Sequence, residues 1–322
     1  MELIYVTAQP DVPYFHWQSK IYGYNFVSKG IKPSQIHIIF GLCNGQKEPS
    51  EGALELRQYG YNVHFYKDER YRKHYIPSIK PFLISKWLEE FPENGKLFFL
   101  HDADIIFREL PDFSNFINDD FNYLSDTKGY IGYEYIKSVC IRHETKFPDL
   151  SHLQLLQEMC DVIGVEIQCV IDRQESSGGG QYIIKNTNKD FWEKVYIDSI
   201  LLYDMMHNFQ RKYPIDNGQI QFWTAEMWAL LWNLWRDCKE TKIIDELSFS
   251  WATSDNDVYE KHPILHMAGV VDSMKTTKFY KGEFININPI SKVIENENYF
   301  DYVDKNSATI NYVKIIKEFA KK

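Results

Sequence analysis

The sequence predicts an α/β fold, a single domain with a central sheet and helices on its faces. In residues 1–100, short apolar runs alternate with amphipathic segments, which is the pattern of parallel strands joined by crossover helices. The 322 residues are enough to bury a full core, and the apolar (44%) and charged (25%) fractions are typical of a packed protein. No internal repeat, low-complexity segment or interdomain linker interrupts the chain.

The first part of the chain gives the clearest series of elements. Strands are expected at residues 3–7, 36–40, 61–66 and 96–104, and helices at about 16–29, 50–58 and 78–91. Ser78 is a possible cap of the last of these helices, and Pro81 is tolerated in its first turns.

After residue 110 the alternation weakens. Further strands are expected at 129–136 and 181–185, helices at 190–207 and 219–236, and a flexible turn at 176–181. We expect the main domain to cover residues 1–285 and a C-terminal tail, residues 286–322, to pack on it.

Two carboxylates end the most apolar predicted strand, "KLFFLHDAD". Asp102 and Asp104 would repel each other and raise each other's pKa if both lay unpaired in a crevice. A divalent cation removes this conflict, because carboxylate oxygens are ligands for Mg²⁺ and Mn²⁺. The alternative is an exposed turn or a helix cap.

A second stretch, "PILHMAGVVDSMKTTKFYKG" at residues 263–282, supports the metal interpretation. His266 follows an apolar run and can supply a third ligand, although a lone histidine is more often structural. Gly269 would let backbone approach a diphosphate, and a lysine beyond it would neutralise departing charge. Lys275 and Lys278 are the candidates for that role, with a solvated basic loop as the alternative; Lys281 follows them.

Together these features resemble the nucleotide-sugar glycosyltransferases of the GT-A fold, which has a Rossmann-like, mixed central sheet. The resemblance implies Mn²⁺ or Mg²⁺ on the diphosphate of a UDP-sugar. Asp104 and His266 would bind the metal directly, and Asp102 would reach the ribose and share the metal. The end of the first strand would hold the uridine, which by position implicates Thr7, Ala8 and Gln9.

A closer resemblance involves four blocks of sequence. They look like the hydroxyproline O-arabinosyltransferases and peptidyl-serine galactosyltransferases of plants and algae, and they lie at residues 14–30, 75–90 with 102–113, 178–195 and 225–235. This resemblance implies retaining transfer of arabinose or galactose from a UDP donor to a hydroxyl. The acidic pair reads D-A-D where those enzymes have D-P-D, and their membrane anchor has no counterpart here.

Three further residues are candidates for the transfer step. Glu226 begins an apolar helix, where it is either an acid favoured by the helix dipole or an active-site carboxylate, and the resemblance favours the second. Gln181 follows three glycines and would shape the sugar and acceptor pocket. Lys80 would contact the nucleotide or the aspartate pair, unless it is a surface lysine. Trp223 is a candidate for stacking, whereas Trp228, Trp232 and Trp235 are expected in the core.

The acceptor stays open between a protein hydroxyl (hydroxyproline or serine) and a hydroxymethylated base of phage DNA. The net charge of −9 speaks mildly against DNA, but the basic stretch at residues 67–75 could serve it. Other classes are a sugar-nucleotide-binding protein without turnover and a metal-dependent phosphoesterase, which would need more carboxylates. Five widely spaced cysteines, no signal peptide and no long apolar run predict a soluble, cytoplasmic protein. Since the resembled enzymes work in the secretory pathway with a membrane anchor, a cytoplasmic version suggests a bacterium or a virus-infected cell as the source.

Overall fold

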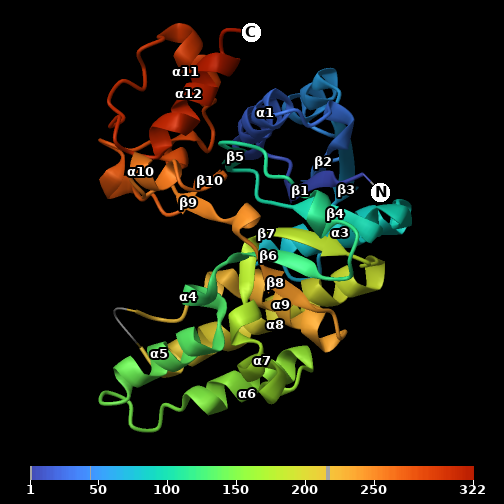
Figure 1. Ribbon diagram of the computed structural model, residues 1–322, viewed down its shortest axis with the longest axis vertical. Helices are drawn as coiled ribbons and strands as arrows, with labels where there is room; N and C mark the ends of the chain where they lie inside the picture. Colours follow the sequence, from blue (N-terminus) through green and yellow to red (C-terminus); the bar gives the residue numbers. More distant parts are fainter. Residues whose placement is uncertain (1, 44, 215–217) are drawn as a thin grey trace. The chain divides into compact units, whose positions relative to one another are not determined.

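A computed structural model describes residues 2–43, 45–214 and 218–322 (Figure 1). It confirms the predicted α/β class, with a mixed sheet of seven strands in the order β3-β2-β1-β4-β7-β6-β8 and a three-stranded sheet, β5-β10-β9. The strands are β1 Ile4–Pro10, β2 Ile36–Leu42, β3 Asn62–Lys67, β4 Leu97–Leu100, β5 Ile105–Phe107, β6 Asn122–Asp126, β7 Gly178–Lys185, β8 Thr241–Ile243, β9 Phe249–Trp251 and β10 Ile264–His266.

Helices separate most of these strands. They are α1 Pro13–Ser28, α2 Glu51–Leu54, α3 Ile79–Glu90, α4 Lys128–Ile131, α5 Tyr133–His143, α6 His152–Ile163, α7 Ile167–Asp172, α8 Lys189–Lys212, α9 Ala225–Arg236, α10 Asn256–Tyr259, α11 Pro289–Glu295 and α12 Thr309–Phe319. In the part of the chain that the structure describes, no helix is both long and apolar enough to cross a membrane.

The chain forms two compact units. The terminal unit comprises Glu2–Asp68, Leu100–Asn115 and Glu246–Lys322, and the middle unit comprises Glu69–Phe99 and Phe116–Asp245. The division expected between residues 285 and 286 stays a prediction.

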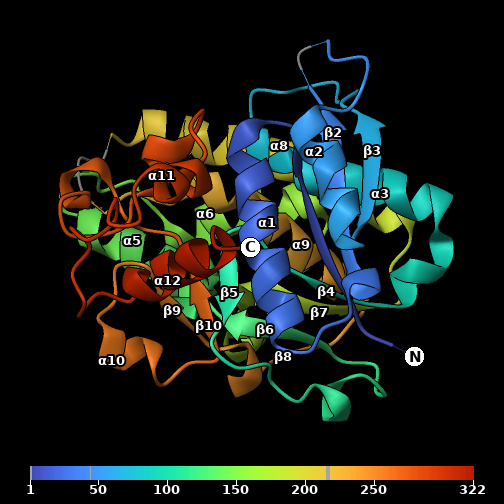
Figure 2. The ribbon, with the colours of Figure 1, turned by 90° about the horizontal axis from the view of Figure 1, so that it is seen from above.

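In the terminal unit, β1, β2 and β3 run parallel, as the alternating pattern predicts. Helix α1 begins with Pro13, whose fixed φ suits the first helical position. Its buried Asn25 donates to the carbonyl of Phe107 (3.0 Å) and accepts from the Phe107 N–H (2.7 Å), which ties α1 to β5. Helix α12 lies beside α1 (Figure 2), and the two share a core cluster that includes Trp17, Tyr312 and Phe279.

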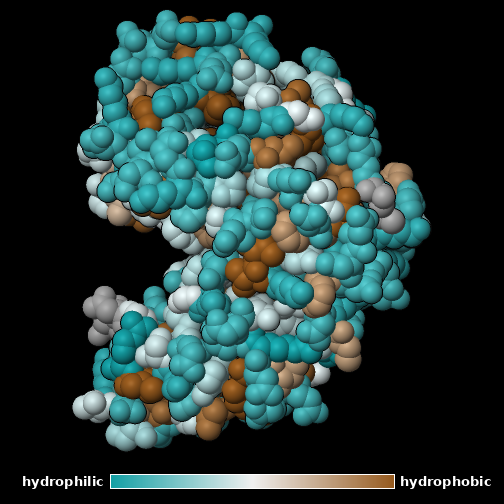
Figure 3. Space-filling model, in the orientation of Figure 1, coloured by the Kyte–Doolittle hydropathy of each residue, from teal (hydrophilic) through white to brown (hydrophobic). Residues whose placement is uncertain are grey.

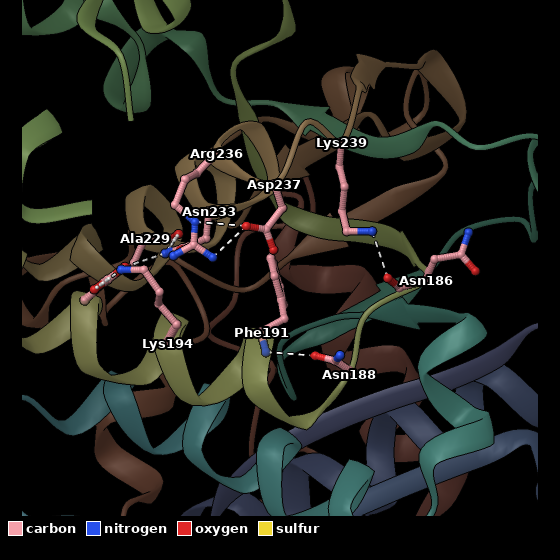
Figure 4. A network of polar contacts seen from close by, with 10 residues as sticks. Asn186, Asn188, Phe191, Lys194, Ala229, Asn233, Arg236, Asp237 and Lys239 are labelled. Atoms are coloured by element: carbon pink, nitrogen blue, oxygen red, sulfur yellow. Dashed lines mark hydrogen bonds and ion pairs between the residues drawn. The ribbon is translucent and has the colours of Figure 1, made fainter. Parts of the chain in front are cut away.

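In the middle unit, β6 pairs antiparallel with β7 and parallel with β8. Helices α3, α8 and α9 pack together, and Trp228, Trp232 and Trp235 are buried in the core, as predicted. Figure 4 shows the polar contacts at the ends of α8 and α9. Asn188 caps α8 by accepting from the Phe191 N–H (2.9 Å), and the Lys239 ammonium donates to the carbonyl of Asn186 (2.8 Å).

Two local predictions were wrong. Residues 129–136 belong to α4 and α5, separated by the extended Gly132, and not to a strand. Tyrosine and isoleucine are common in strands, but the buried positions Ile136, Val139 and Cys140 follow helical spacing. The supposed flexible turn at 176–181 already enters β7, where the glycines allow close packing: a Cβ on Gly178 would lie 2.4 Å from the Ser125 carbonyl oxygen.

The face drawn in Figure 3 is largely hydrophilic, with hydrophobic residues in scattered groups. Such scattered apolar residues are normal for a protein surface and do not mark an interface by themselves.

Candidate metal centre

Asp102, Asp104 and His266 meet in the terminal unit. In the sequence His266 follows Asp102 by 164 residues and Asp104 by 162. The two aspartates lie in the connection between the end of β4 at Leu100 and the start of β5 at Ile105. His266 ends β10, which pairs antiparallel with β5 so that His266 lies opposite Ile105. The Met267 N–H also donates to the carbonyl of Asp104 (2.9 Å). Strand pairing therefore holds the histidine beside the acidic pair.

The three side chains have the spacing of a metal site. His266 Nε2 lies 3.4 Å from Asp104 Oδ1 and 3.6 Å from Asp102 Oδ2, and each residue offers a ligand atom within 4.8 Å of the others. The Asp104 and His266 side chains are buried, whereas that of Asp102 is 34% exposed. Two carboxylates and an imidazole are a donor set that can hold a divalent cation.

Aromatic rings hold the imidazole of His266 in place. The ring of Trp251, on the neighbouring strand β9, stacks on it at 5.5 Å between centroids with an angle of 24°. Phe249 contacts it at 5.7 Å. The ring can therefore present Nε2 to the carboxylates with little rotational freedom.

Lys281 is the lysine of the basic segment that reaches this centre. Its ammonium contacts Asp104 Oδ2 directly. Lys275 instead pairs with Asp272 (3.0 Å), and Lys278 donates to Ser307 Oγ (3.3 Å). The sequence contains three lysines at intervals of three, so it gave no local signal for choosing among them.

The charges of this cluster perturb one another strongly. Burial alone would raise the pKa of Asp104, but Lys281 and His266 outweigh burial and hold the pKa of that carboxyl far below its usual range. Burial would lower the pKa of Lys281, but Asp104 raises it above its ordinary value. Asp104 is therefore an ionised, buried carboxylate with a positive partner.

Two tyrosines complete the surroundings of Asp104, and the sequence did not single them out. Tyr14 of α1 lies near both Lys281 and Asp104, and burial raises the pKa of its hydroxyl. Tyr312 of α12 is fully buried, and its hydroxyl has no hydrogen-bond partner among the residues that the structure describes.

The candidates for uridine binding lie on β1, with their side chains buried. Thr7 Oγ1 donates to Gln9 Oε1 (2.9 Å), and Gln9 Nε2 donates to Ser19 Oγ (2.8 Å). Ala8, between them, is also buried. Since the polar side chains bond internally, contacts of this strand with a base would have to come largely from its backbone.

Gly269 follows β10 with a φ of +94°, a backbone conformation that other residues rarely adopt. A Cβ there would also come within 3.3 Å of Thr253 Cγ2. Glycine is therefore required by the turn itself, whether or not a ligand approaches it.

The candidates for the transfer step lie in the middle unit. Lys80 Nζ is 3.4 Å from Glu226 Oε2, and both side chains are largely buried. The hydroxyl of Tyr75 accepts from the Glu226 N–H (2.9 Å) and donates to the carbonyl of Trp223 (2.7 Å). Tyr75, which the sequence did not single out, thus links the start of α9 to the preceding turn.

The remaining two candidates differ in exposure. Gln181 is fully buried in β7, and its Oε1 accepts from Ser125 Oγ (2.7 Å). Trp223 is 50% exposed and contacts the edge of Phe222 at 5.7 Å. Of the two, Trp223 is the one with ring surface open to solvent.

Comparison with known proteins gives likenesses in structure only. No family model matches the chain, and no curated protein matches it in sequence. Among solved structures, the WbbM bifunctional glycosyltransferase aligns over 97% of this chain at 8% identity and a TM-score of 0.44, and this chain spans about half (51%) of its length.

Two other solved structures align over 83% of the chain. Mouse xyloside xylosyltransferase 1 has 9% identity and a TM-score of 0.41, with 98% of its own chain covered. A glycosyltransferase involved in glycosylation of the major capsid of PBCV-1 has 11% identity and a TM-score of 0.37, with 95% covered. The resemblance to the plant arabinosyl- and galactosyltransferases stays a prediction.

Proposed function

We propose that the protein is a metal-dependent glycosyltransferase that moves a sugar from a UDP-sugar to a hydroxyl of a macromolecule. The observation that carries the proposal is the cluster of Asp102, Asp104 and His266 at the end of a central strand. The ammonium of Lys281 contacts the Asp104 carboxylate of this cluster. The cluster has the donor set for one divalent cation and the positive charge that a diphosphate requires.

In this proposal Asp104 and His266 hold the cation, and Asp102, the most exposed of the three, reaches the donor ribose and shares the cation. The cation would supply Lewis-acid stabilisation of the departing diphosphate. The lysines of the same segment neutralise the leaving phosphate. The position of Lys281 supports it for this role, and Lys275 and Lys278 remain candidates on the same loop.

Donor recognition would involve the end of β1, with Thr7, Ala8 and Gln9 beside the uridine, and the turn at Gly269 beside the diphosphate. In the middle unit, Glu226 would stabilise positive charge at the anomeric carbon, and Gln181 would shape the sugar pocket. The buried Lys80–Glu226 ion pair supports a functional interpretation of Lys80 over that of a surface lysine.

The finer proposal is retaining transfer of arabinose or galactose to a protein hydroxyl or to a hydroxymethylated base of phage DNA. It derives from the four sequence blocks and from the basic stretch at residues 67–75. In that stretch Arg70 is buried, while Arg72 and His74 both contact Asp204. Because the carboxylate of Asp204 offsets part of the positive charge of residues 67–75, less of that charge is left for DNA phosphates. These contacts therefore favour the protein acceptor over DNA.

A metal-dependent phosphoesterase is less well supported. A two-metal site needs more carboxylates, and among the described residues one cluster, with three possible ligands, could hold a metal. A sugar-nucleotide-binding protein without turnover would differ from the proposed enzyme in one measurement: it would not release UDP from a UDP-sugar.

The decisive experiment measures UDP release from a panel of UDP-sugars with Mn²⁺ and with EDTA. Wild-type protein should turn over one preferred sugar only with metal. Asp104→Asn should abolish release, whereas Asp257→Asn, an exposed carboxylate of the same unit, should retain it. Absence of release from every sugar, together with no thermal protection by UDP and Mn²⁺, would overturn the proposal.

A further inference from the structure

We propose that Lys281 and the divalent cation compete for Asp104, so that cation binding releases the Lys281 ammonium to the phosphates of the donor. This inference rests on the proposed function, and it adds a coupling between cation and nucleotide that a set of metal ligands does not imply.

The competition follows from how the two oxygens of Asp104 are used. Oδ2 contacts the Lys281 ammonium, and Oδ1 lies 3.4 Å from His266 Nε2. A cation held by Asp104 together with His266 therefore shares one carboxylate with an ammonium already in place. The Asp104 side chain is only 7% exposed, so water screens the repulsion between the two positive charges weakly.

Lys281 can yield its position without moving the backbone. It begins a short 3₁₀ segment, Lys281–Phe284, whose last residue is buried in the core. The carbonyl of Phe284 accepts from Trp17 Nε1 (2.9 Å), which anchors the segment. The Lys281 side chain is 27% exposed, so a swing of the side chain alone can carry the ammonium toward solvent.

A phosphate group is the partner that this released ammonium would meet. Asp102, the exposed member of the cluster, marks the side on which a ligand of the cation can enter. A diphosphate bound to the cation there brings negative charge to the displaced ammonium. Lys275 and Lys278 each have partners outside the Asp104 site, so their contacts do not oppose cation binding.

The consequence is reciprocal coupling. The cation should bind more tightly when a diphosphate takes up the ammonium, and the nucleotide should bind more tightly when the cation has displaced it from Asp104. Without nucleotide, Lys281 should weaken cation binding.

Calorimetry with Mn²⁺ alone tests the first half of this inference. Lys281→Met keeps much of the side-chain stem and removes the charge, and Lys292→Met, on α11 of the same unit and paired with Glu295 (2.8 Å), is the matched control. We expect Lys281→Met to bind Mn²⁺ about tenfold more tightly than wild type, and Lys292→Met to bind it equally. Saturating UDP should then increase Mn²⁺ affinity in the wild type much more than in Lys281→Met.

Thermal unfolding gives a second readout, which stays informative even if the variant is less stable than wild type. Lys281→Met without metal should melt below wild type, because Asp104 loses its buried counter-charge, and Mn²⁺ should raise its melting temperature by more than it raises that of wild type.

Equal or weaker Mn²⁺ binding by Lys281→Met would refute the competition; if the wild type still releases UDP with Mn²⁺, the proposed function stands. Failure of both proteins to bind Mn²⁺, together with metal-independent or absent UDP release, would refute the proposed function and this inference with it.

Discussion

Asp198 offers a quantitative test of the packing in the middle unit. It lies on α8, with its side chain 3% exposed, and burial raises the pKa of its carboxyl to about 7. Lys194, one turn earlier, reaches Oδ2 at 2.7 Å, and the side-chain amide of Asn233 on α9 donates to the same oxygen at 2.8 Å. The perturbation is Asp198→Asn, which keeps the volume of the side chain and removes the titration.

The sign follows from the direction of the shift. A raised pKa means that the folded protein holds a proton that the unfolded chain releases near its ordinary value of about 3.9, so stability is lost as pH rises toward the folded pKa. Between pH 5.5 and 7 the cost is about 1.4 kcal/mol per pH unit, or about 2 kcal/mol in all, and above the folded pKa it levels off. The wild type should therefore lose about 2 kcal/mol relative to Asp198→Asn between pH 5.5 and 8.5.

Urea denaturation at both pH values measures this difference, provided that the transitions are two-state. Asp190→Asn, an exposed aspartate of the same helix, is the control, and its difference from wild type should be the same at both pH values. A pH-independent difference for Asp198→Asn would show that Lys194 keeps the carboxylate ionised in the folded protein, and would refute the argument.

Three further predictions concern single contacts. Tyr75→Phe removes the hydroxyl that bonds the Glu226 N–H (2.9 Å), so it should lower kcat for UDP release while Mn²⁺ affinity measured by calorimetry stays at the wild-type value. Cys238→Gly should raise the free energy of unfolding in urea by about 0.5–1 kcal/mol, because Cys238 holds a φ of +56° that glycine adopts without strain. Gly178→Ala should lower the melting temperature by several degrees, since its Cβ would collide with a backbone oxygen at 2.4 Å, whereas Gly129→Ala, with open space around it, should not.

The acidic pair could be singled out from the sequence, because local features define it. An apolar run followed by Asp102 and Asp104 indicates a strand end, and strand ends of parallel sheets are where ligands bind. The sequence indicated that a histidine could be the third ligand, but it could not place His266 beside the aspartates. That position depends on the pairing of strands β5 and β10. Pairing between strands so far apart in the chain cannot be inferred from local sequence.

Other features depended on packing that no single sequence displays. The glycines at 178–180 suggested flexibility, yet they begin a strand in which close neighbours exclude larger residues. Similarly, Lys281 differs from Lys275 and Lys278 in its partner: Lys281 contacts Asp104, whereas the other two lysines contact Asp272 and Ser307. Spacing alone therefore identified the basic segment but not the residue that reaches Asp104.

The presence of Lys281 on Asp104 also follows from the cost of a buried charge. An ionised carboxylate with a side chain only 7% exposed and without a positive partner would destabilise the fold by about 3–5 kcal/mol. A cation could offset this cost only while it is bound, whereas a lysine of the same chain offsets it whenever no cation is bound. The protein can thus fold before the cation arrives, and the same arrangement makes the cation compete with the lysine that stabilised its site.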